Sequence, residues 1–252
     1  MSLSITRILI FDIWGDYAHF RKIETTTSPL TYSIPTGTAL AGLTSAIIGR
    51  TRDSYYSFFG PDKIKFAIEI LNPIKKIRIN INLLGTEKDK GNLGRKNGIV
   101  KGCSPTSFEF VKNPKYRIYA GVVGNNSGVY DFFETLKKFL VAHKTIYTPY
   151  LGISELIANF CFIADISGKD ITNLETSGNL KINSAIRIGA SNVIIENDKF
   201  YTREVLPWYM DENRIVKDYA QIMFESNALP FTIGNFSTQK IYKIKDSNII
   251  FL

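Results

Sequence analysis

Hydrophobic residues in this chain occur in short runs, separated by segments rich in glycine, asparagine and proline. The run at residues 8–14 is apolar except for Asp12, and its length favours a strand over a helix. Further runs predict strands at residues 66–71, 77–84, 116–123 and 157–166. Apolar and polar side chains alternate in residues 77–84, which predicts one solvated face. Residues 157–166 are expected to be buried, with Cys161 contributing to packing.

Two segments have the spacing of amphipathic helices. Residues 36–48 place Leu40, Leu43 and Ile47 on one stripe, and Gly49 supplies a stop signal. A second helix is expected to begin at Asp131, because Asp131 and Glu134 have the spacing of a capping box. Its apolar face is expected to pack on a sheet and consists of Phe132, Phe133, Leu136, Phe139 and Leu140.

The order strand, helix, three strands, helix, strand predicts an α+β chain with a ferredoxin-like domain and a long insertion. After residue 168 no long helix is expected. Short strands are predicted there at residues 182–188, 192–196, 216–224 and 240–252. We therefore expect an RRM-like domain at residues 1–167 and a smaller β-rich C-terminal part at residues 168–252.

The loop after the first strand carries side chains that bind nucleic acid in many proteins. Tyr17, His19 and Phe20 can stack on unpaired bases, and Arg21 can bind phosphate. The helix start at Thr36, Gly37 and Thr38 offers unpaired backbone amides as a further anion site.

The formal net charge of +8 is concentrated in one quarter of the chain. Residues 61–120 hold 13 Lys and Arg against 5 Asp and Glu, whereas the remaining residues hold 18 of each sign. An excess confined in this way indicates a surface that faces a polyanion. A solvated basic loop is the simpler alternative, and a soluble α/β interaction protein that binds an acidic partner is another.

Residues 85–107 contain five glycines and little with which to build a core. A segment this long inside a compact domain is usually functional or disordered. We expect a basic thumb, inserted at about residues 85–115, that becomes ordered on RNA. Its basic residues are Lys88, Lys90, Arg95, Lys96 and Lys101.

Four blocks of sequence resemble the Cas-five family of CRISPR-associated proteins, within the RAMP superfamily. They are FDIWGDYAHFR, YSIPTGTALAGLTSAIIG, NPKYRIY and YTPYLGISE, and their order is most similar to the type I-B branch. The resemblance implies a subunit of a type I Cascade complex that holds the 5′ handle of the CRISPR RNA. It implies a Cas-seven-type backbone subunit, the large subunit and target DNA near the 5′ end of the guide as partners. Tyr150 and Gly152 of the last block are further candidate contacts.

Enzymatic signatures are sparse. The chain has no HExxH, Gly-Lys-Ser/Thr or GxSxG motif and only two histidines, so we expect no metal, no cofactor and no catalytic activity. The alternative is a metal-independent endoribonuclease that processes CRISPR precursor RNA. In some relatives Tyr, Lys and His perform that acid–base chemistry, for which Tyr32, His143 and Lys144 are the candidates here.

Cys103 and Cys161 are far apart and have no metal-ligand spacing. No apolar stretch approaches the roughly 20 residues that a membrane span requires. No signal peptide is expected, because Arg7 and Asp12 interrupt the N-terminal apolar run. These features predict a reduced, cytoplasmic protein without membrane contact.

Overall fold

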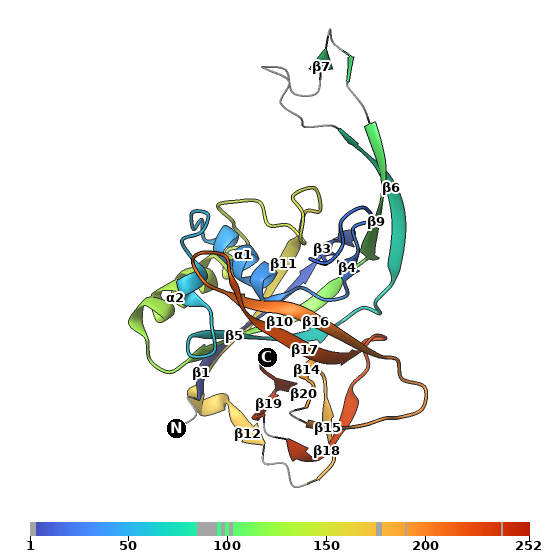
Figure 1. The fold of residues 1–252 in the computed structure, drawn as a ribbon. Coiled ribbons are helices and arrows are strands. Elements are labelled where there is room, and N and C mark those ends of the chain that lie inside the picture. Colours follow the sequence, from blue (N-terminus) through green and yellow to red (C-terminus); the bar gives the residue numbers. More distant parts are fainter. Residues whose placement is uncertain are drawn as a thin grey trace.

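The computed structural model describes residues 4–84, 95–96, 99–100, 103–174, 178–189, 191–237 and 239–252. At its centre lies a four-stranded antiparallel sheet in the order β11-β1-β10-β5 (Figure 1). The strands are β1 (Ile5–Trp14), β5 (Ile64–Ile70), β10 (Lys115–Val123) and β11 (Asn159–Ser167). Numbered by their sequence order, they follow the 4-1-3-2 arrangement of a ferredoxin-like fold, which confirms the predicted class.

Helices α1 (Gly37–Ile47) and α2 (Ser127–Val141) pack on one face of this sheet. Thr36 caps α1, because its side chain accepts a hydrogen bond from the amide of Ala39 at 3.0 Å. The prediction that α2 begins at Asp131 is wrong. Asn126 is the cap, its side chain accepts from the amide of Val129 at 3.2 Å, and the helix begins one turn earlier. The expected apolar face is correct, with Phe139 partly buried.

Alternating residues of β1 contribute to two different cores. Leu9, Phe11 and Ile13 pack with the helices, whereas Ile8 and Ile10 pack on the opposite side against the C-terminal strands. This alternation has the period of two that a strand buried on both faces requires. The central sheet is therefore covered on both faces.

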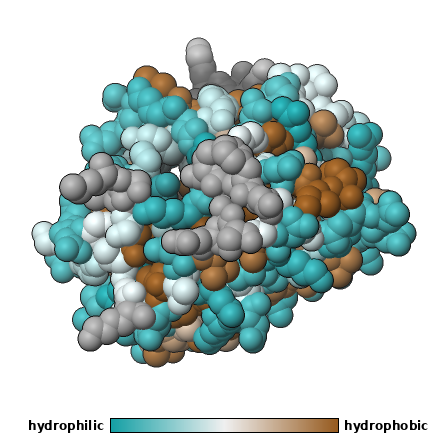
Figure 2. Space-filling view, turned by 90° about the horizontal axis from the view of Figure 1, so that it is seen from below, coloured by the Kyte–Doolittle hydropathy of each residue, from teal (hydrophilic) through white to brown (hydrophobic). Residues whose placement is uncertain are grey.

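The C-terminal residues form small antiparallel sheets (Figure 1). Their strands are β12 (Thr172–Leu174), β13 (Leu180–Ile182), β14 (Ile186–Arg187), β15 (Ser191–Ile194), β16 (Tyr201–Met210), β17 (Val216–Glu225), β18 (Phe231–Ser237), β19 (Ile241–Ile244) and β20 (Ser247–Ile250). β16 and β17 lie on the helical side of the central sheet, and β19 and β20 lie on the other. The face at the bottom of Figure 1 is mainly hydrophilic, with small hydrophobic groups between polar ones (Figure 2).

The free edge of β5 is covered by C-terminal residues. The amide of Ala185 donates to the carbonyl of Ile68 at 2.8 Å, and the amide of Leu252 donates to the carbonyl of Phe66 at 3.0 Å. These bonds satisfy groups that would otherwise form an exposed sheet edge. The C-terminal part is thus continuous with the sheet that it covers.

The remaining short elements are β2 (Tyr17–Ala18), β3 (Phe20–Arg21), β4 (Thr31–Tyr32), η1 (Tyr56–Phe58) and η2 (Gly168–Asp170). β11 lies at the edge of the central sheet. The expectation that it is a buried strand is wrong, because its residues are mostly half-buried and Cys161 is exposed as a free thiol.

Candidate nucleic-acid interface

A two-stranded ribbon projects from the molecule between β5 and β10 (Figure 1). It consists of β6 (Lys76–Leu84) and β9 (Cys103–Lys112), paired in register from Lys76–Val111 to Leu84–Cys103. Two short strands, β7 (Arg95–Lys96) and β8 (Ile99–Val100), pair with each other nearer its tip. At its base, the amide of Leu71 donates to the carbonyl of Lys115 at 2.9 Å, which closes the insertion.

One face of the ribbon is apolar. Because side chains alternate along a strand, Ile77, Ile79 and Ile81 share a face with Phe108 and Phe110 of the partner strand. Phe110 is buried at the base, whereas Ile79 is 37% exposed. The apolar face therefore runs from the core outward to solvent. The sequence predicted that one face of residues 77–84 is solvated. The apolar face is partly exposed as well, because no second layer packs on it along a two-stranded ribbon.

His19 is buried against this ribbon. Its ring centroid lies 5.3 Å from that of Phe108 and 5.6 Å from that of Phe110, and only 1% of the residue is exposed. Nδ1 donates to the carbonyl of Glu109 at 2.7 Å, so the neutral ring carries its proton there. Nε2 is buried with no hydrogen-bond partner among the described residues. Burial lowers the pKa of His19, because a charged ring would lack solvation.

The expectation that His19 and Phe20 are loop side chains presented to bases is wrong. Phe20 lies in β3, pairs with Tyr32 of β4 and is only 4% exposed. Tyr17 is half-buried in β2, with its ring edge against Phe110 at 6.0 Å between centroids. Contact of these three residues with RNA stays a prediction, and for the two buried residues it would require the segment to open.

Arg21 is exposed, as expected for a phosphate-binding residue. Its guanidinium donates to the carbonyl of Thr25 at 3.1 Å. Across β3 and β4 it pairs with Thr31, whose amide donates to the carboxylate of Glu109 in the ribbon at 3.2 Å. Arg21 therefore lies next to the base of the ribbon.

The start of α1 is less open than an anion site requires. A Cβ on Gly37 would lie 2.2 Å from the carbonyl oxygen of Trp208, so this glycine permits close packing of α1 against β16. Thr36 is buried as the cap, and its hydroxyl lies 2.9 Å from that of Thr38. Thr36 and Gly37 are buried, whereas Thr38 is half-buried and lines a cavity that is described below.

Gly152 supplies the turn that the sequence indicated. Its φ is +97°, and a Cβ there would lie 2.0 Å from the carbonyl oxygen of His19. The amide of His19 donates to the carbonyl of Leu151 at 3.0 Å, so this loop holds the β2–β3 segment in place. The neighbouring Tyr150 is 45% exposed and forms an isolated bridge with Ile157. RNA contact of Gly152 and Tyr150 stays a prediction.

The expected basic residues of the thumb are not placed in full. Lys88, Lys90 and Lys101 lie outside the described residues, and for Arg95 and Lys96 the structure describes only the pairing of their backbone with β8. Nearer the base, Lys75, just before β6, and Lys112, the last residue of β9, are both exposed, with the amide of Lys112 donating to the carbonyl of Lys75 at 2.8 Å.

Arg78 is a third exposed cation of the ribbon, on its polar face. Within the part of the chain that the structure describes, no carboxylate lies in ion-pair distance of Lys75, Arg78 or Lys112. The sequence analysis did not single out these three residues as RNA-binding candidates. The only sign of them in the sequence is the excess of basic residues in the 61–120 segment, to which they contribute. By contrast, Arg117 is paired with Asp12 at 2.8 Å across β1 and β10, so part of the excess is neutralised internally.

A buried acid that sequence reasoning missed fixes the base of the ribbon. Glu204 of β16 accepts hydrogen bonds from the amide of Ser33 at 2.8 Å and from its hydroxyl at 2.9 Å. Lys76 Nζ lies 3.2 Å from the same carboxylate, and Lys22 Nζ lies 3.7 Å from it. Nothing local in the sequence indicates this network, because Glu204 is more than 100 residues away from each of its partners.

The three candidate residues for ribonuclease chemistry differ in accessibility. His143 and Lys144 are exposed after the end of α2, with His143 in a left-handed conformation at φ 50°. Tyr32 is buried, and burial raises its pKa to about 12, which disfavours proton transfer near neutral pH. Within the described ranges no cluster of three or more His, Cys, Asp or Glu side chains is arranged to hold a metal ion.

No helix in the described part of the chain is long and apolar enough to cross a membrane. No curated protein matches the chain. A solved CRISPR protein from Archaeoglobus fulgidus is similar over 97% of this chain and 99% of its own, with a TM-score of 0.56 and 13% identity. A chain of a solved "CRISPR RNA-guided surveillance complex" gives a TM-score of 0.44 and 14% identity, over 88% of this chain and 91% of its own.

The sequence comparison is more specific than the likeness of folds. The family model described as "CRISPR-associated protein (Cas_Cas5)" matches residues 8–158, which is more than half of the chain. This match includes most of β1, both helices, the ribbon and the Gly152 turn. The chain belongs to the Cas-five family of CRISPR-associated proteins.

Proposed function

We propose that this protein is a non-catalytic, CRISPR RNA-binding subunit of a type I Cascade complex of the I-B branch, which holds the 5′ handle of the RNA in the cytoplasm. The observation that carries the proposal is the ribbon. It presents unpaired cations and a partly exposed apolar face together, in a chain of a CRISPR-associated family. Both kinds of group are needed to bind a single-stranded nucleic acid.

The cations would bind phosphates. Lys75 and Lys112 lie side by side at the base, and Arg21 lies nearby on β3. Such contacts position an RNA strand without reading its sequence, and they weaken as salt increases. Sequence preference for the handle would come from bases that leave the stack and contact Phe108 and Ile79 on the apolar face.

The proposal includes protein partners. The outer ribbon would dock a Cas-seven-type backbone subunit and the large subunit, with target DNA passing near the 5′ end of the guide. The part of Ile79 that is exposed, 37%, and that of Leu83, 43%, are available for such contact. No cofactor is proposed.

The test uses end-labelled repeat RNA with purified protein in EDTA, analysed on parallel native and denaturing gels. Retention of uncut RNA, lost when the 5′ handle is scrambled, is expected. A discrete cut in EDTA that disappears in His143→Ala would instead identify a metal-independent ribonuclease. Equal retention of a random RNA of the same length would refute handle recognition and favour a general polyanion or acidic-protein binder.

A further inference from the structure

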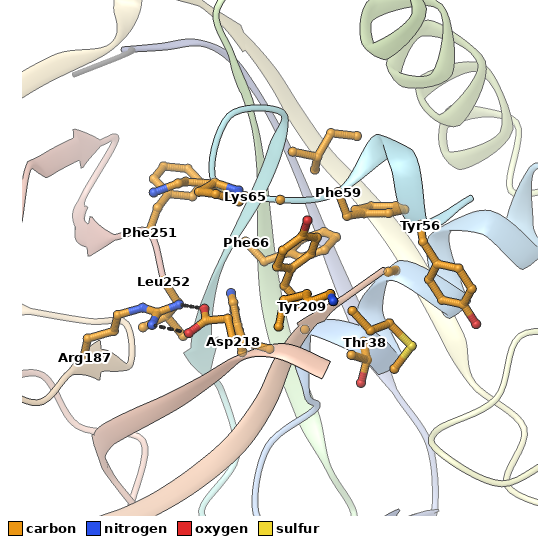
Figure 3. Close-up of a pocket in the computed structure, with 18 of the residues that line it drawn as sticks. Thr38, Tyr56, Phe59, Lys65, Phe66, Arg187, Tyr209, Asp218, Phe251 and Leu252 are labelled. Carbon is orange, nitrogen blue, oxygen red and sulfur yellow. Dashed lines mark hydrogen bonds and ion pairs between the residues drawn. The ribbon is translucent and has the colours of Figure 1, made fainter. Parts of the chain in front are cut away.

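A cavity of about 450 Å³ lies between the first residues of α1, the η1–β5 segment and the β16–β17 hairpin (Figure 3). This volume is within the range of roughly 300–1,000 Å³ that small-molecule sites occupy. None of its lining residues belongs to the ribbon. The cavity is therefore separate from the surface proposed to bind the RNA handle.

Several aromatic side chains line the cavity. Tyr56, Phe59, Phe66, Tyr209 and Phe251 lie around it in Figure 3. Phe59 and Phe66 are stacked on each other, with centroids 5.7 Å apart and planes 23° apart. Both of these rings are almost fully buried, whereas the ring of Tyr209 is half-buried and offers a flat apolar face to a planar ligand.

The rim of the cavity is held in place by hydrogen bonds. Tyr56 donates its hydroxyl proton to Asp53 at 2.9 Å, and Arg214 makes two hydrogen bonds to the same carboxylate, at 2.7 and 2.6 Å. Arg214 lies in the turn of the β16–β17 hairpin. This pairing joins two sides of the rim, so the cavity is formed before a ligand enters.

Lys65 gives the cavity its charge. Two other cations in the wall already have partners: Arg187 binds Asp218 at 2.5 Å, and Lys217 binds Asp211 at 2.9 Å. Lys65 has no carboxylate within ion-pair distance among the described residues. Burial, together with the neighbouring Arg187, lowers the pKa of Lys65, and the attraction of Asp218 offsets this only in part. An anion beside the ammonium group would relieve both effects.

We propose that this cavity binds a nucleotide, with its phosphate at Lys65 and its base against the face of Tyr209. A planar apolar group joined to an anion is the ligand chemistry that aromatic walls around a single unpaired cation favour. The same chemistry can arrive as a free mononucleotide or as one residue of an RNA strand. The inference does not depend on handle binding by the ribbon.

Calorimetric titration of the full chain with AMP, GMP, CMP and UMP tests this assignment. Inorganic phosphate and an RNA tetranucleotide serve as the comparison ligands. At least one nucleotide or the tetranucleotide is expected to bind saturably, with a Kd below about 1 mM. Binding by mononucleotides identifies a free nucleotide site, whereas binding by the tetranucleotide alone identifies a site for a residue within a strand.

Two pairs of variants place the ligand in the cavity. Lys65→Gln is expected to weaken binding about tenfold, which is the effect of losing one charge-assisted hydrogen bond. Lys63→Gln removes the same charge two residues away, outside the lining, and is expected to bind as the wild type does. Tyr209→Ala is expected to weaken binding of nucleotides but not of phosphate, with the exposed Tyr219→Ala as its control.

Three results would overturn the proposal: no saturable binding of any nucleotide or of the tetranucleotide, unchanged affinity in Lys65→Gln, or phosphate binding as tightly as the nucleotides. The last result would mean that the aromatic walls contribute nothing. Handle recognition by the ribbon is tested with other residues and a longer RNA, so failure of one proposal is distinguishable from failure of the other.

Discussion

Lys76 at the base of the ribbon and Glu204 of β16 are joined by an ion pair, with 3.2 Å between Nζ and Oε1, although they are 128 positions apart in the chain. The carboxylate of Glu204 is almost fully buried, and it also accepts two hydrogen bonds from Ser33. The C-terminal part thereby fixes the segment from which the ribbon projects. Removing a buried acid with this many partners is expected to lower the stability of the fold strongly, because its partners lose their acceptor.

Glu204→Ala is expected to lower the free energy of unfolding by about 3 kcal/mol. The variant leaves the amide and hydroxyl of Ser33 without their acceptor, and it leaves Lys76 with the carbonyl of Thr31 at 2.8 Å and only a more distant carboxylate, Glu109, at 3.8 Å. Urea unfolding followed by circular dichroism measures the change. Glu212→Ala, at an exposed position in the β16–β17 turn, is the control and should change stability little. Equal stability of the two variants would contradict the structural role.

His19 should make the fold less stable in mild acid. Its pKa is lowered in the folded state, so below about pH 6.5 the unfolded chain binds more protons than the folded one. The contribution of His19 is therefore present above that pH and lost as the pH falls through it, with a slope of up to about 1.4 kcal/mol per pH unit. Unfolding in urea between neutral pH and mild acid measures this loss.

His19→Gln should show a shallower loss of stability with falling pH than the wild type. His143→Gln, which removes the chain's other histidine at an exposed position, is the matched control. If His19→Gln had the wild-type slope, the buried neutral ring would not be the cause.

Gly152→Ala should destabilise the fold by about 3 kcal/mol or more, since strain at positive φ adds to a clash with the carbonyl of His19 at 2.0 Å. Gly189→Ala separates the two effects. Gly189 also has positive φ, at 85°, but nothing lies within 4 Å of its Cβ position, so a loss of about 1 kcal/mol is expected. Thermal unfolding of both variants measures the difference, and similar losses would argue against the close approach.

The double variant Lys75→Gln, Lys112→Gln should bind repeat RNA more weakly and with a lower salt dependence. For a single strand, removing one lysine–phosphate interaction reduces the slope of log affinity against log salt by about 0.7. Filter binding over a range of salt concentrations gives both quantities. Lys243→Gln is the control, because Lys243 is an exposed lysine in β19, on the face of the central sheet away from the helices and outside the ribbon. A double variant with an unchanged slope would remove these two lysines from the interface.

The sequence was sufficient for the elements with strong local patterns. β1 and α1 were expected within a few residues, because an apolar run and a helical stripe are local signals. The start of α2 was missed because Asp131 and Glu134 have the spacing of a capping box inside the helix, while Asn126 supplies the actual cap. β16 was not predicted. It contains Pro207, and a proline within a run of residues argues against a strand.

The candidate site was less predictable, since burial depends on partners that are distant in the sequence. Phe20 and His19 have the composition of a binding loop, yet β4 covers one and the ribbon covers the other. Cys161 lies in an apolar run, yet it is exposed, whereas its neighbour Phe160 is buried. The cavity around Lys65 combines six separate segments of the chain, and no local pattern brings these together.

The ribbon leaves the central sheet after β5 and returns at β10. Its two ends lie next to each other, because the amide of Leu71 donates a hydrogen bond to the carbonyl of Lys115. An insertion whose ends meet in this way can lengthen or shorten without changing the register of the strands beneath it, at little entropic cost. The distance that the ribbon spans can therefore change among related proteins, or by engineering, while the supporting sheet stays the same.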